Sequence, residues 1–330
     1  MCSMSPQSPR KALSETVEQL RNASEETTSA KSDAASPLGH ALNLLGDMWT
    51  LRIVMLIFVG RKRFQELREG LSISDPVLSR RLASLVDEGI LYTREYQRNP
   101  PRHEYLLTPA GLDLWQVLAA LWVWDRRWAG HQHRDATTRM VHLTCGHYAR
   151  PVFGCGRCGA IGITIHDVSG RIDEDLLHDA AYRRSRRSPA VAAPSDGTAL
   201  LGDRWSLFLL SDAFTGTHRF NDFQARLNIS PVTLTQRLNV FVEAGLMTRE
   251  NLSGGKRQEY RLTPKALDFF DVTTTINGWA CRWLSEDGHS GLNLIHIPCG
   301  RDLQPQFTCN ACNAVLERDT VRFQGRIDAP

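Results

Sequence analysis

The chain contains one long segment twice. Residues 45–49 (LGDMW) return as residues 201–205 (LGDRW), and further matches follow at nearly the same separation until both copies end on Gly-Arg-Ile-Asp. Similarity over this length exceeds the period of solenoid repeats and indicates two whole domains of like fold. The length of 330 residues is also typical of two domains. We call residues 36–175 copy 1 and residues 196–330 copy 2.

Composition is typical of a soluble globular protein. Hydrophobic residues make up 42% and charged residues 23%, and no run approaches the roughly 18 apolar residues that a membrane span requires. The start of the sequence has no apolar signal region, so we expect a cytoplasmic protein without membrane contact. The net charge of +3 permits nucleic-acid binding without indicating it, so such a function must rest on local motifs.

Apolar periodicity predicts the same series of elements in each copy. In copy 1 we expect two helices within 42–57 that break at Gly46-Asp47, a short helix over 64–70, a helix over 75–88, strands over 90–96 and 104–107, and one long helix from Thr108-Pro109 to Trp128. Ser74 or Asp75 can cap the helix over 75–88, and Gly89 closes it. Copy 2 repeats the order, with Ser230 as the cap, Gly245 as the end, and strands over 246–250 and 260–262.

A short helix, a turn, a second helix and a hairpin form a winged helix-turn-helix. The predicted class is therefore mostly α with small β-hairpins (α+β). The second helix fits the major groove of DNA, with residues near its N-terminus facing base edges. Candidate base contacts are the small or polar residues on its outer face: Val77, Ser79, Arg80 and Arg81 in copy 1, and Thr233, Thr235, Gln236 and Arg237 in copy 2.

Cations of the hairpins are candidates for contacts with DNA phosphates. They are Arg94, Arg98 and Arg102 in copy 1, and Arg249, Lys256 and Arg257 in copy 2. Taken singly, each charge is equally well explained as a solvated surface residue. Their recurrence at matching places in both copies favours double-stranded DNA as the partner.

Each copy resembles the winged-helix domain of the HxlR family of bacterial transcriptional regulators. The matching motifs of copy 1 are residues 45–50 (LGDMWT), 63–67 (RFQEL), Ile73-Ser74, 78–82 (LSRRL), Gly89 and 101–111 (PRHEYLLTPAG). Copy 2 matches more loosely, at Gly202, Trp205, Arg219-Phe220, Arg237-Leu238 and 260–264 (YRLTP). The resemblance covers residues 36–130 and 195–285.

The resemblance implies a DNA-binding homodimeric regulator whose terminal helices form the dimer interface. Family members are usually single-domain chains, whereas this chain is a fusion of two such domains. We therefore expect a covalent pseudo-dimer. Whether the whole chain also self-associates through those helices is left open. Members that sense electrophiles or oxidants often carry a Cys-Pro pair before the first helix. This chain has Ser36-Pro37 and Ser195-Asp196 there, so the resemblance does not extend to that thiol switch.

Six of the eight cysteines form two triplets with identical spacing. His142-x2-Cys145-x9-Cys155-x2-Cys158 returns as His296-x2-Cys299-x9-Cys309-x2-Cys312. Free thiols or disulfides are the simpler explanation, but paired Cys-x2-Cys knuckles in a chain without a signal peptide favour metal. We expect a closed Cys3His zinc site within each copy, which stabilises a small zinc-ribbon-like module. His147 is a rival fourth ligand; copy 2 has Asp302 near that point, which favours His142 and His296.

Two alternatives to a DNA-binding regulator remain open, whereas an enzyme is not expected. The Cys-x2-Cys pairs lack the His-x-Glu of zinc deaminases, so we expect no enzyme. Winged helices joined to zinc ribbons also serve as protein-interaction adaptors, in which one or both copies do not bind DNA. Copy 2 alone could have lost DNA contact and only dimerise or hold a ligand. The operator, the sign of regulation and any small-molecule effector are not predicted by the sequence.

These patterns divide the chain into six parts. We expect a disordered tail (1–35), a winged helix-turn-helix (36–130), a zinc-ribbon-like module (131–175), a linker (176–195), a second winged helix-turn-helix (196–285) and a second zinc-ribbon-like module (286–330). The tail is rich in Ser, Ala, Glu and Thr, and the linker combines arginines with Pro and Ser, compositions that do not support a packed core.

Overall fold

The computed structural model describes residues 36–46, 48–128, 139–172, 197–201, 204–251 and 258–324. The tail (1–35) and the linker (176–195) lie outside these residues. The described part consists of helices with small antiparallel sheets, which confirms the expected α+β class. Within these ranges, no helix has the length and apolar character needed to cross a membrane.

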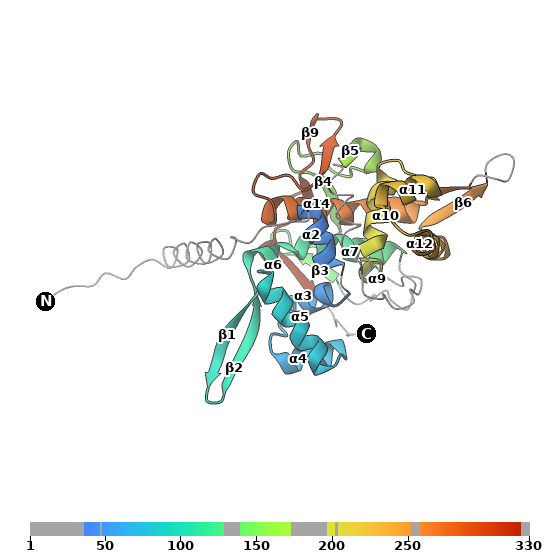
Figure 1. The fold of residues 1–330 in the computed structure, drawn as a ribbon. Helices are drawn as coiled ribbons and strands as arrows, with labels where there is room; N and C mark the ends of the chain where they lie inside the picture. The colour runs from blue at the N-terminus through green and yellow to red at the C-terminus, as the bar shows by residue number, and fades with distance from the viewer. Residues whose placement is uncertain are drawn as a thin grey trace. The chain divides into compact units, whose positions relative to one another are not determined.

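Copy 1 forms its helices and hairpin in the expected order (Figure 1). Its elements are α2 (Pro37–Leu45), α3 (Met48–Phe58), α4 (Phe64–Leu71), α5 (Asp75–Asp87), β1 (Leu91–Arg98), β2 (Pro101–Leu107), α6 (Pro109–Asp113) and α7 (Trp115–Trp128). Separate α2 and α3 confirm the expected break, although Asp47 itself lies outside the described residues. The hairpin is longer than its apolar pattern indicates, because polar residues continue the pairing as far as Arg98 opposite Pro101.

Local chemistry fixes the ends of α5. Ser74 is its N-cap residue and Pro76 stands in its first turn, where a missing backbone N–H costs nothing. Three leucines at helical spacing, Leu78, Leu82 and Leu85, are buried in the core. Gly89 follows the helix with φ +67°, a left-handed conformation that glycine adopts without strain. The helix therefore starts and stops where the sequence predicts.

The prediction of a single long helix from Thr108-Pro109 to Trp128 is wrong, because this segment forms two helices, α6 and α7. Thr108 caps α6, its Oγ1 accepting a hydrogen bond from the Gly111 N–H at 3.1 Å. Gly111 lies so close to the Ile90 carbonyl that a Cβ there would stand 2.3 Å from the oxygen. This contact ties α6 to the start of the hairpin, and the helix is interrupted at Leu114.

Copy 2 repeats this series. Its elements are α9 (Gly197–Leu201), α10 (Arg204–Phe214), α11 (Phe220–Leu227), α12 (Pro231–Glu243), β6 (Met247–Asn251), β7 (Gln258–Leu262), α13 (Pro264–Leu267) and α14 (Phe270–Trp283). Ser230 caps α12, its hydroxyl oxygen accepting a hydrogen bond from the Thr233 N–H at 3.2 Å. Gly245 has φ +69°, which matches Gly89 of copy 1.

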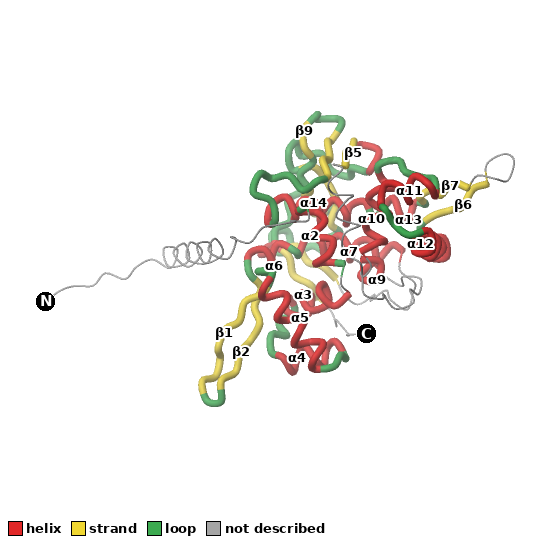
Figure 2. Tube along the Cα trace, viewed as in Figure 1, coloured by secondary structure: helices red, strands yellow, loops and turns green. Residues whose placement is uncertain are grey.

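The strands that follow each winged helix pair across the two copies. Those of copy 1 are β3 (Arg139–His142), β4 (Pro151–Cys155) and β5 (Val168–Ile172), the last preceded by the 3-10 turn η1 (Ile165–Asp167). Those of copy 2 are β8 (Leu292–His296), β9 (Arg301–Asp302), β10 (Pro305–Cys309) and, after the 3-10 turn η2 (Arg318–Thr320), β11 (Val321–Gln324). Strand β4 pairs with β10, β3 with β11, and β5 with β8, all antiparallel. Figure 2 marks these strands in yellow. The two segments are therefore interleaved.

Helices also join the copies. Helix α14 of copy 2 packs against α2 and α7 of copy 1, and α7 packs against α9. The buried ring of Trp124 meets Phe269 edge-on, with centroids 5.2 Å apart. One contiguous hydrophobic core runs through both copies. The cores of the two copies are thus continuous with each other in the described part of the chain.

Candidate nucleic-acid interface and metal centres

The outer face of α5 carries the base-contact candidates of copy 1. Ser79 and Arg80 are exposed, whereas Val77 and Arg81 are half-buried. The leucines between them are buried, so the exposed pair lies on the side of the helix that faces away from the core. An exposed arginine in this position can donate two parallel hydrogen bonds to a guanine edge.

Helix α12 of copy 2 presents a different surface. Thr235 and Gln236 are exposed, and the Thr235 hydroxyl donates to the Pro231 carbonyl at 2.8 Å. Thr233 is half-buried. Arg237, a candidate from the sequence, is only 4% exposed, so in this arrangement its side chain belongs to the core.

Val232 is an outward-facing residue that sequence reasoning missed. It lies in the first turn of α12 and is 69% exposed. An apolar side chain at this end of a recognition helix can contact a thymine methyl group. The sequence signal for its exposure was its place directly after Pro231, in the first turn of the helix and before the first buried residue.

The hairpins display cations as expected. Arg98 and Arg102 are exposed near the tip of β1–β2. Arg94 is exposed too, but its Nε donates to Glu104 Oε1 at 2.8 Å, which partly neutralises its charge. In copy 2, Arg249 is exposed, lies 5.6 Å from the centre of the Tyr260 ring and donates to Asn239. Lys256 and Arg257 lie outside the described residues.

The first candidate metal centre combines residues of both copies. His142, Cys145, Cys309 and Cys312 place their ligand atoms within 4.8 Å of one another. His142 Nδ1 lies 3.3 Å from the sulfur of Cys145 and 3.3 Å from that of Cys312. The sulfurs of Cys145 and Cys309 are 3.9 Å apart. The histidine and Cys309 are buried, whereas Cys312 is exposed.

The second centre has the same composition. Cys155, Cys158, His296 and Cys299 also lie within 4.8 Å of one another. His296 Nδ1 is 3.4 Å from the Cys158 sulfur and 3.3 Å from the Cys299 sulfur. Each of the eight residues expected to bind metal therefore belongs to one of two Cys3His clusters, and His147 belongs to neither.

The expected grouping of these ligands within each copy is wrong. Antiparallel pairing of β4 with β10 sets Cys309 opposite Pro151, where the segment carrying His142 and Cys145 ends. The same register sets Cys155 opposite Pro305, where the segment carrying His296 and Cys299 ends. Each knuckle is thereby brought to the His-Cys pair of the other copy.

Both clusters fit a tetrahedral zinc ion. Zinc bonds of about 2.3 Å to sulfur and 2.0–2.1 Å to nitrogen give tetrahedral edges of about 3.8 Å between sulfurs and about 3.6 Å between sulfur and nitrogen. The separations of 3.9 Å and 3.3–3.4 Å lie near these values. Three thiolates and one imidazole complete the coordination shell and leave no position for a reacting water.

Backbone donors favour ionisation of the first cysteine in each knuckle, whereas the pKa of the second, Cys158 or Cys312, is raised, against one backbone hydrogen bond, by burial and by hydrogen bonds from neighbouring cysteines. Burial acts against ionisation of Cys155, but hydrogen bonds from the N–H groups of Arg157 and Cys158 outweigh it and lower the pKa of this thiol. The pKa of Cys309 is lowered in the same way, against burial, by the N–H groups of Ala311 and Cys312. Since metals bind the thiolate, these bonds favour the form of cysteine that a zinc site requires.

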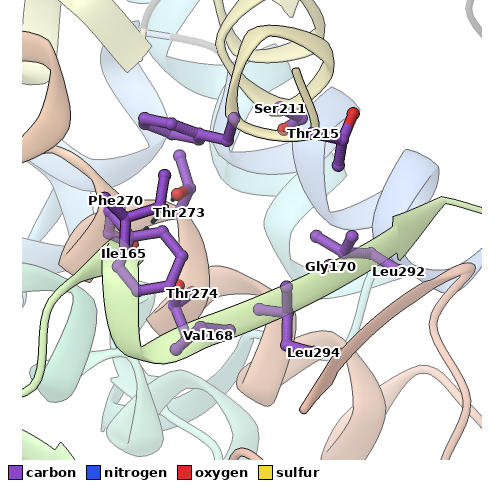
Figure 3. A pocket seen from close by; sticks show the side chains of 11 residues that line it. Ile165, Val168, Gly170, Ser211, Thr215, Phe270, Thr273, Thr274, Leu292 and Leu294 are labelled. Carbon is purple, nitrogen blue, oxygen red and sulfur yellow. Dashed lines mark hydrogen bonds between the residues drawn. The ribbon is translucent and has the colours of Figure 1, made fainter. Parts of the chain in front are cut away.

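A small pocket opens between α10 and α14 of copy 2 and the strand pair β5–β8, in which β5 belongs to copy 1 (Figure 3). Its cavity volume is about 30 Å³, which is room for about two water molecules. Hydroxyl-bearing side chains contribute to its wall, namely Ser211, Thr215, Thr273 and Thr274. Thr274 Oγ1 is buried and makes no hydrogen bond within the described residues.

Copy 1 carries apolar side chains at the positions that match these four hydroxyl-bearing residues. Met55, Val59, Leu118 and Ala119 correspond by sequence to the four hydroxyl-bearing residues. Gly170 lines the pocket in β5, whereas β11 carries Phe323 at the corresponding place in its pairing. Phe323 meets Trp122 edge-on, with ring centroids 6.0 Å apart. The two copies therefore differ inside as well as on their recognition helices.

Comparison with known proteins gives concordant matches. The HxlR-like helix-turn-helix family matches residues 44–133 and again residues 200–288. An uncharacterized HTH-type transcriptional regulator of Mycobacterium bovis is 38% identical over 122 residues, which are 37% of this chain and 77% of that regulator. A second, from Methanothermobacter thermautotrophicus, is 31% identical over 96 residues, 29% of this chain and 73% of that protein. A third, from Synechocystis, is 34% identical over 86 residues, 26% of this chain and 64% of that protein.

Proposed function

The chain belongs to the HxlR-like helix-turn-helix family, and on that premise we propose that it is a sequence-specific DNA-binding transcriptional regulator that acts as a covalent pseudo-dimer. The family matches each of the two winged helices separately, so one chain carries two such domains. The observation that carries the proposal is that α5 and α12 both turn polar side chains outward at matching positions, Arg80 in copy 1 and Gln236 in copy 2.

The hairpins supply the contacts that position such a protein on DNA. Arg98 and Arg102 are exposed on the first hairpin, and Arg249 is exposed on the second. Phosphate contacts of this kind fix register and orientation, and side chains on the recognition helix then select the bases. With a net charge of only +3, affinity must come from these local cations.

Pairing of the copies within one chain is supported by reciprocal contacts between them. Trp128 Nε1 donates to Asp268 Oδ2 at 2.7 Å, and Trp283, the matching residue of copy 2, donates to Asp113 Oδ2 at 2.8 Å. An interface in which residue i meets j and j′ meets i′ is the pattern of a two-fold dimer. Here it joins two halves of one polypeptide.

Zinc is the metal that best suits the two Cys3His clusters. Thiolate and imidazole ligands in a tetrahedral set favour zinc over magnesium or calcium, which prefer oxygen ligands. Without an open coordination position, such an ion stabilises the fold and catalyses nothing. We therefore assign the metal a structural role in the regulator and expect no enzymatic activity.

A narrower alternative is favoured by the surface of α12. Val232 is exposed and Arg237 is buried, so this helix offers fewer cationic donors than α5. In that alternative copy 1 reads DNA, and copy 2 pairs with it or serves as an adaptor for another protein. Base preference in the half of the operator assigned to copy 2 separates the two functions.

The experiment is to define the operator by genome-wide binding-site mapping followed by footprinting. Two unlike recognition helices in one chain should read two unlike half-sites, about one helical turn apart or a multiple of it. We expect an asymmetric operator that is occupied by one chain, as measured by the mass of the complex. Gln236→Ala should relax base preference in one half-site only.

A palindromic operator occupied by two chains would contradict pairing within the chain. Like copies would then pair between chains, and copy 2 would lie outside the main contact. Absence of any sequence preference in footprinting, with equal affinity for random DNA, would contradict the regulator itself and leave the adaptor.

A further inference from the structure

We propose that the two metal ions act as clasps between the copies, each ion held by two ligands from copy 1 and two from copy 2. This inference deepens the proposed zinc binding and does not depend on DNA binding. In the first centre His142 and Cys145 come from copy 1, and Cys309 and Cys312 from copy 2. In the second centre copy 1 contributes the knuckle, Cys155 and Cys158, and copy 2 contributes His296 and Cys299.

We call the two ligands that one copy contributes to one centre a half-set. Each half-set is a local structure closed by its own backbone hydrogen bond. The His-Cys pair of copy 1 lies on a tight turn, closed by a hydrogen bond from the Gly146 N–H to the His142 carbonyl at 2.8 Å. The knuckle of copy 2 is closed by a bond from the Asn313 N–H to the Cys309 carbonyl, also 2.8 Å. Two ligands leave a tetrahedral ion half-coordinated, so each half-set needs a complement, and the pairing of β4 with β10 supplies it from the other copy.

Hydrogen bonds beside the ligands hold the half-sets in this exchanged order. The Arg150 N–H donates to Asn310 Oδ1 at 2.6 Å, from copy 1 to copy 2. The Gly156 N–H donates to the Gln304 carbonyl at 2.8 Å, again between the copies. These contacts lie directly next to the knuckles, so the exchange follows from the backbone arrangement of the module and does not depend on cysteine side-chain placement alone.

Binding both ions then couples metal affinity to association of the copies. An ion that binds only the paired arrangement stabilises that arrangement by mass action. Removal of both ions should leave the α7–α14 contact in place but release the four ligand strands that join the copies. The metals thereby fix the relative positions of the two winged helices.

A pair of double variants in the full chain distinguishes exchanged from self-contained sites. Cys145→Ser with Cys312→Ser removes two ligands of the first centre only, so the chain should retain one zinc ion. Cys145→Ser with Cys158→Ser removes one ligand from each centre, so the chain should retain none after dialysis against a chelator. Self-contained sites give the reverse: none for the first variant and one for the second.

The readout is zinc per folded chain by elemental analysis, with circular dichroism and elution volume confirming the fold. Each single variant, Cys145→Ser or Cys158→Ser, serves as calibration and should lose one ion. Cys158→Ser with Cys299→Ser, the mirror of the first double variant, should again retain one ion, so a folding failure at one centre does not leave the result undecided.

Retention of one ion by both same-centre variants and none by the cross-centre variant supports the clasp. The reversed pattern, or an unchanged content of two ions in any variant, overturns it. A wild-type chain without stoichiometric zinc overturns the zinc assignment as well, while the operator experiment still tests DNA binding separately.

Discussion

Trp124 and Trp279 stand at matching positions of the two copies, and each donates its indole N–H to a backbone carbonyl of the other copy over 2.9 Å. Trp124 bonds to the Lys265 carbonyl and Trp279 to the Ala110 carbonyl. Both rings are buried. The duplication has thus preserved a reciprocal contact that a symmetric dimer would make twice, and it makes specific substitutions informative.

Trp279→Phe should lower the free energy of unfolding by about 1–3 kcal/mol, because the Ala110 carbonyl loses its donor and the smaller ring fills less of the interface. Trp124→Phe should have a similar effect from the other side. Urea titration followed by circular dichroism measures both. Trp283→Phe is the matched control: Trp283 is 39% exposed, and its partner Asp113 keeps a second bond from Arg282. A loss from the control as large as that from Trp279→Phe would mean that the buried hydrogen bonds do not hold the interface.

Arg80→Ala, on α5, should cost about 1–3 kcal/mol at the cognate site and relax the preference for the base that it contacts. The side chain is exposed on the outer face of the helix. Quantitative binding to the cognate operator and to each single-base variant of it measures the effect. Equal losses on cognate and random DNA would remove Arg80 from base recognition.

Arg98→Ala, on the hairpin, should instead weaken binding to all sequences alike. If Arg98 holds one phosphate, the slope of log affinity against log salt should fall by about one. A titration series at several salt concentrations measures this slope. A change confined to one operator sequence would show that Arg98 reads bases and does not simply hold a phosphate.

Asp271→Asn should stabilise the fold at neutral and alkaline pH but not in acid. Burial, with a smaller contribution from the Asp268 charge, raises the pKa of Asp271 to about 7. Between about pH 4 and pH 7 the folded state therefore keeps a proton that the unfolded state has lost, so stability falls as pH rises through this window. The variant lacks this loss. Because the side chain is partly exposed, solvent reduces the size of the effect. We expect the free energy of unfolding of the variant to exceed that of the wild type by about 1–2 kcal/mol above pH 7. Urea titration at pH 5 and pH 8 measures this difference. A gain that is the same at both pH values would exclude ionisation as its cause.

Thr274→Val should raise the free energy of unfolding by about 1 kcal/mol, since it removes a buried hydroxyl that has no partner within the described residues. Thr273→Val is the matched control, because its hydroxyl donates to the Phe270 carbonyl at 3.0 Å. The control should lose about 1 kcal/mol. Thermal or urea unfolding measures both. If Thr274→Val destabilises the chain as much as the control does, the hydroxyl is hydrogen-bonded to a molecule in the pocket.

Much of each winged helix could be predicted from local patterns. Ser-Asp-Pro and Ser-Pro predicted the starts of α5 and α12, and Gly89 and Gly245 predicted their ends, because caps and left-handed turns depend on near neighbours alone. The interruption at Leu114 was missed because the apolar spacing continues from α6 into α7 without a break.

The grouping of the metal ligands could not have been predicted. Both copies carry a His-x2-Cys pair and a Cys-x2-Cys knuckle with the same spacing. Either pair can complete either knuckle with identical chemistry, so the motif leaves the choice open. Only the pairing of β4 with β10 decides it, and that pairing joins residues about 150 positions apart. The burial of Arg237 was missed because arginine side chains are mostly exposed in folded proteins, so its position on the helix predicted an outward-facing residue.

The interleaved strands also set an order of events during synthesis. His142 in β3 pairs with Val321 in β11, which follows it by 179 residues. At roughly 5–20 residues per second, the ribosome needs about 10–35 s to deliver that partner. During this interval β3, β4 and the thiols of copy 1 have been made but have neither their strands nor their metal complement. The two candidate metal centres can reach their observed grouping only after Cys299 and Cys312 have been made. Until copy 2 emerges, the four candidate metal ligands of copy 1 therefore lack the residues with which the folded chain groups them.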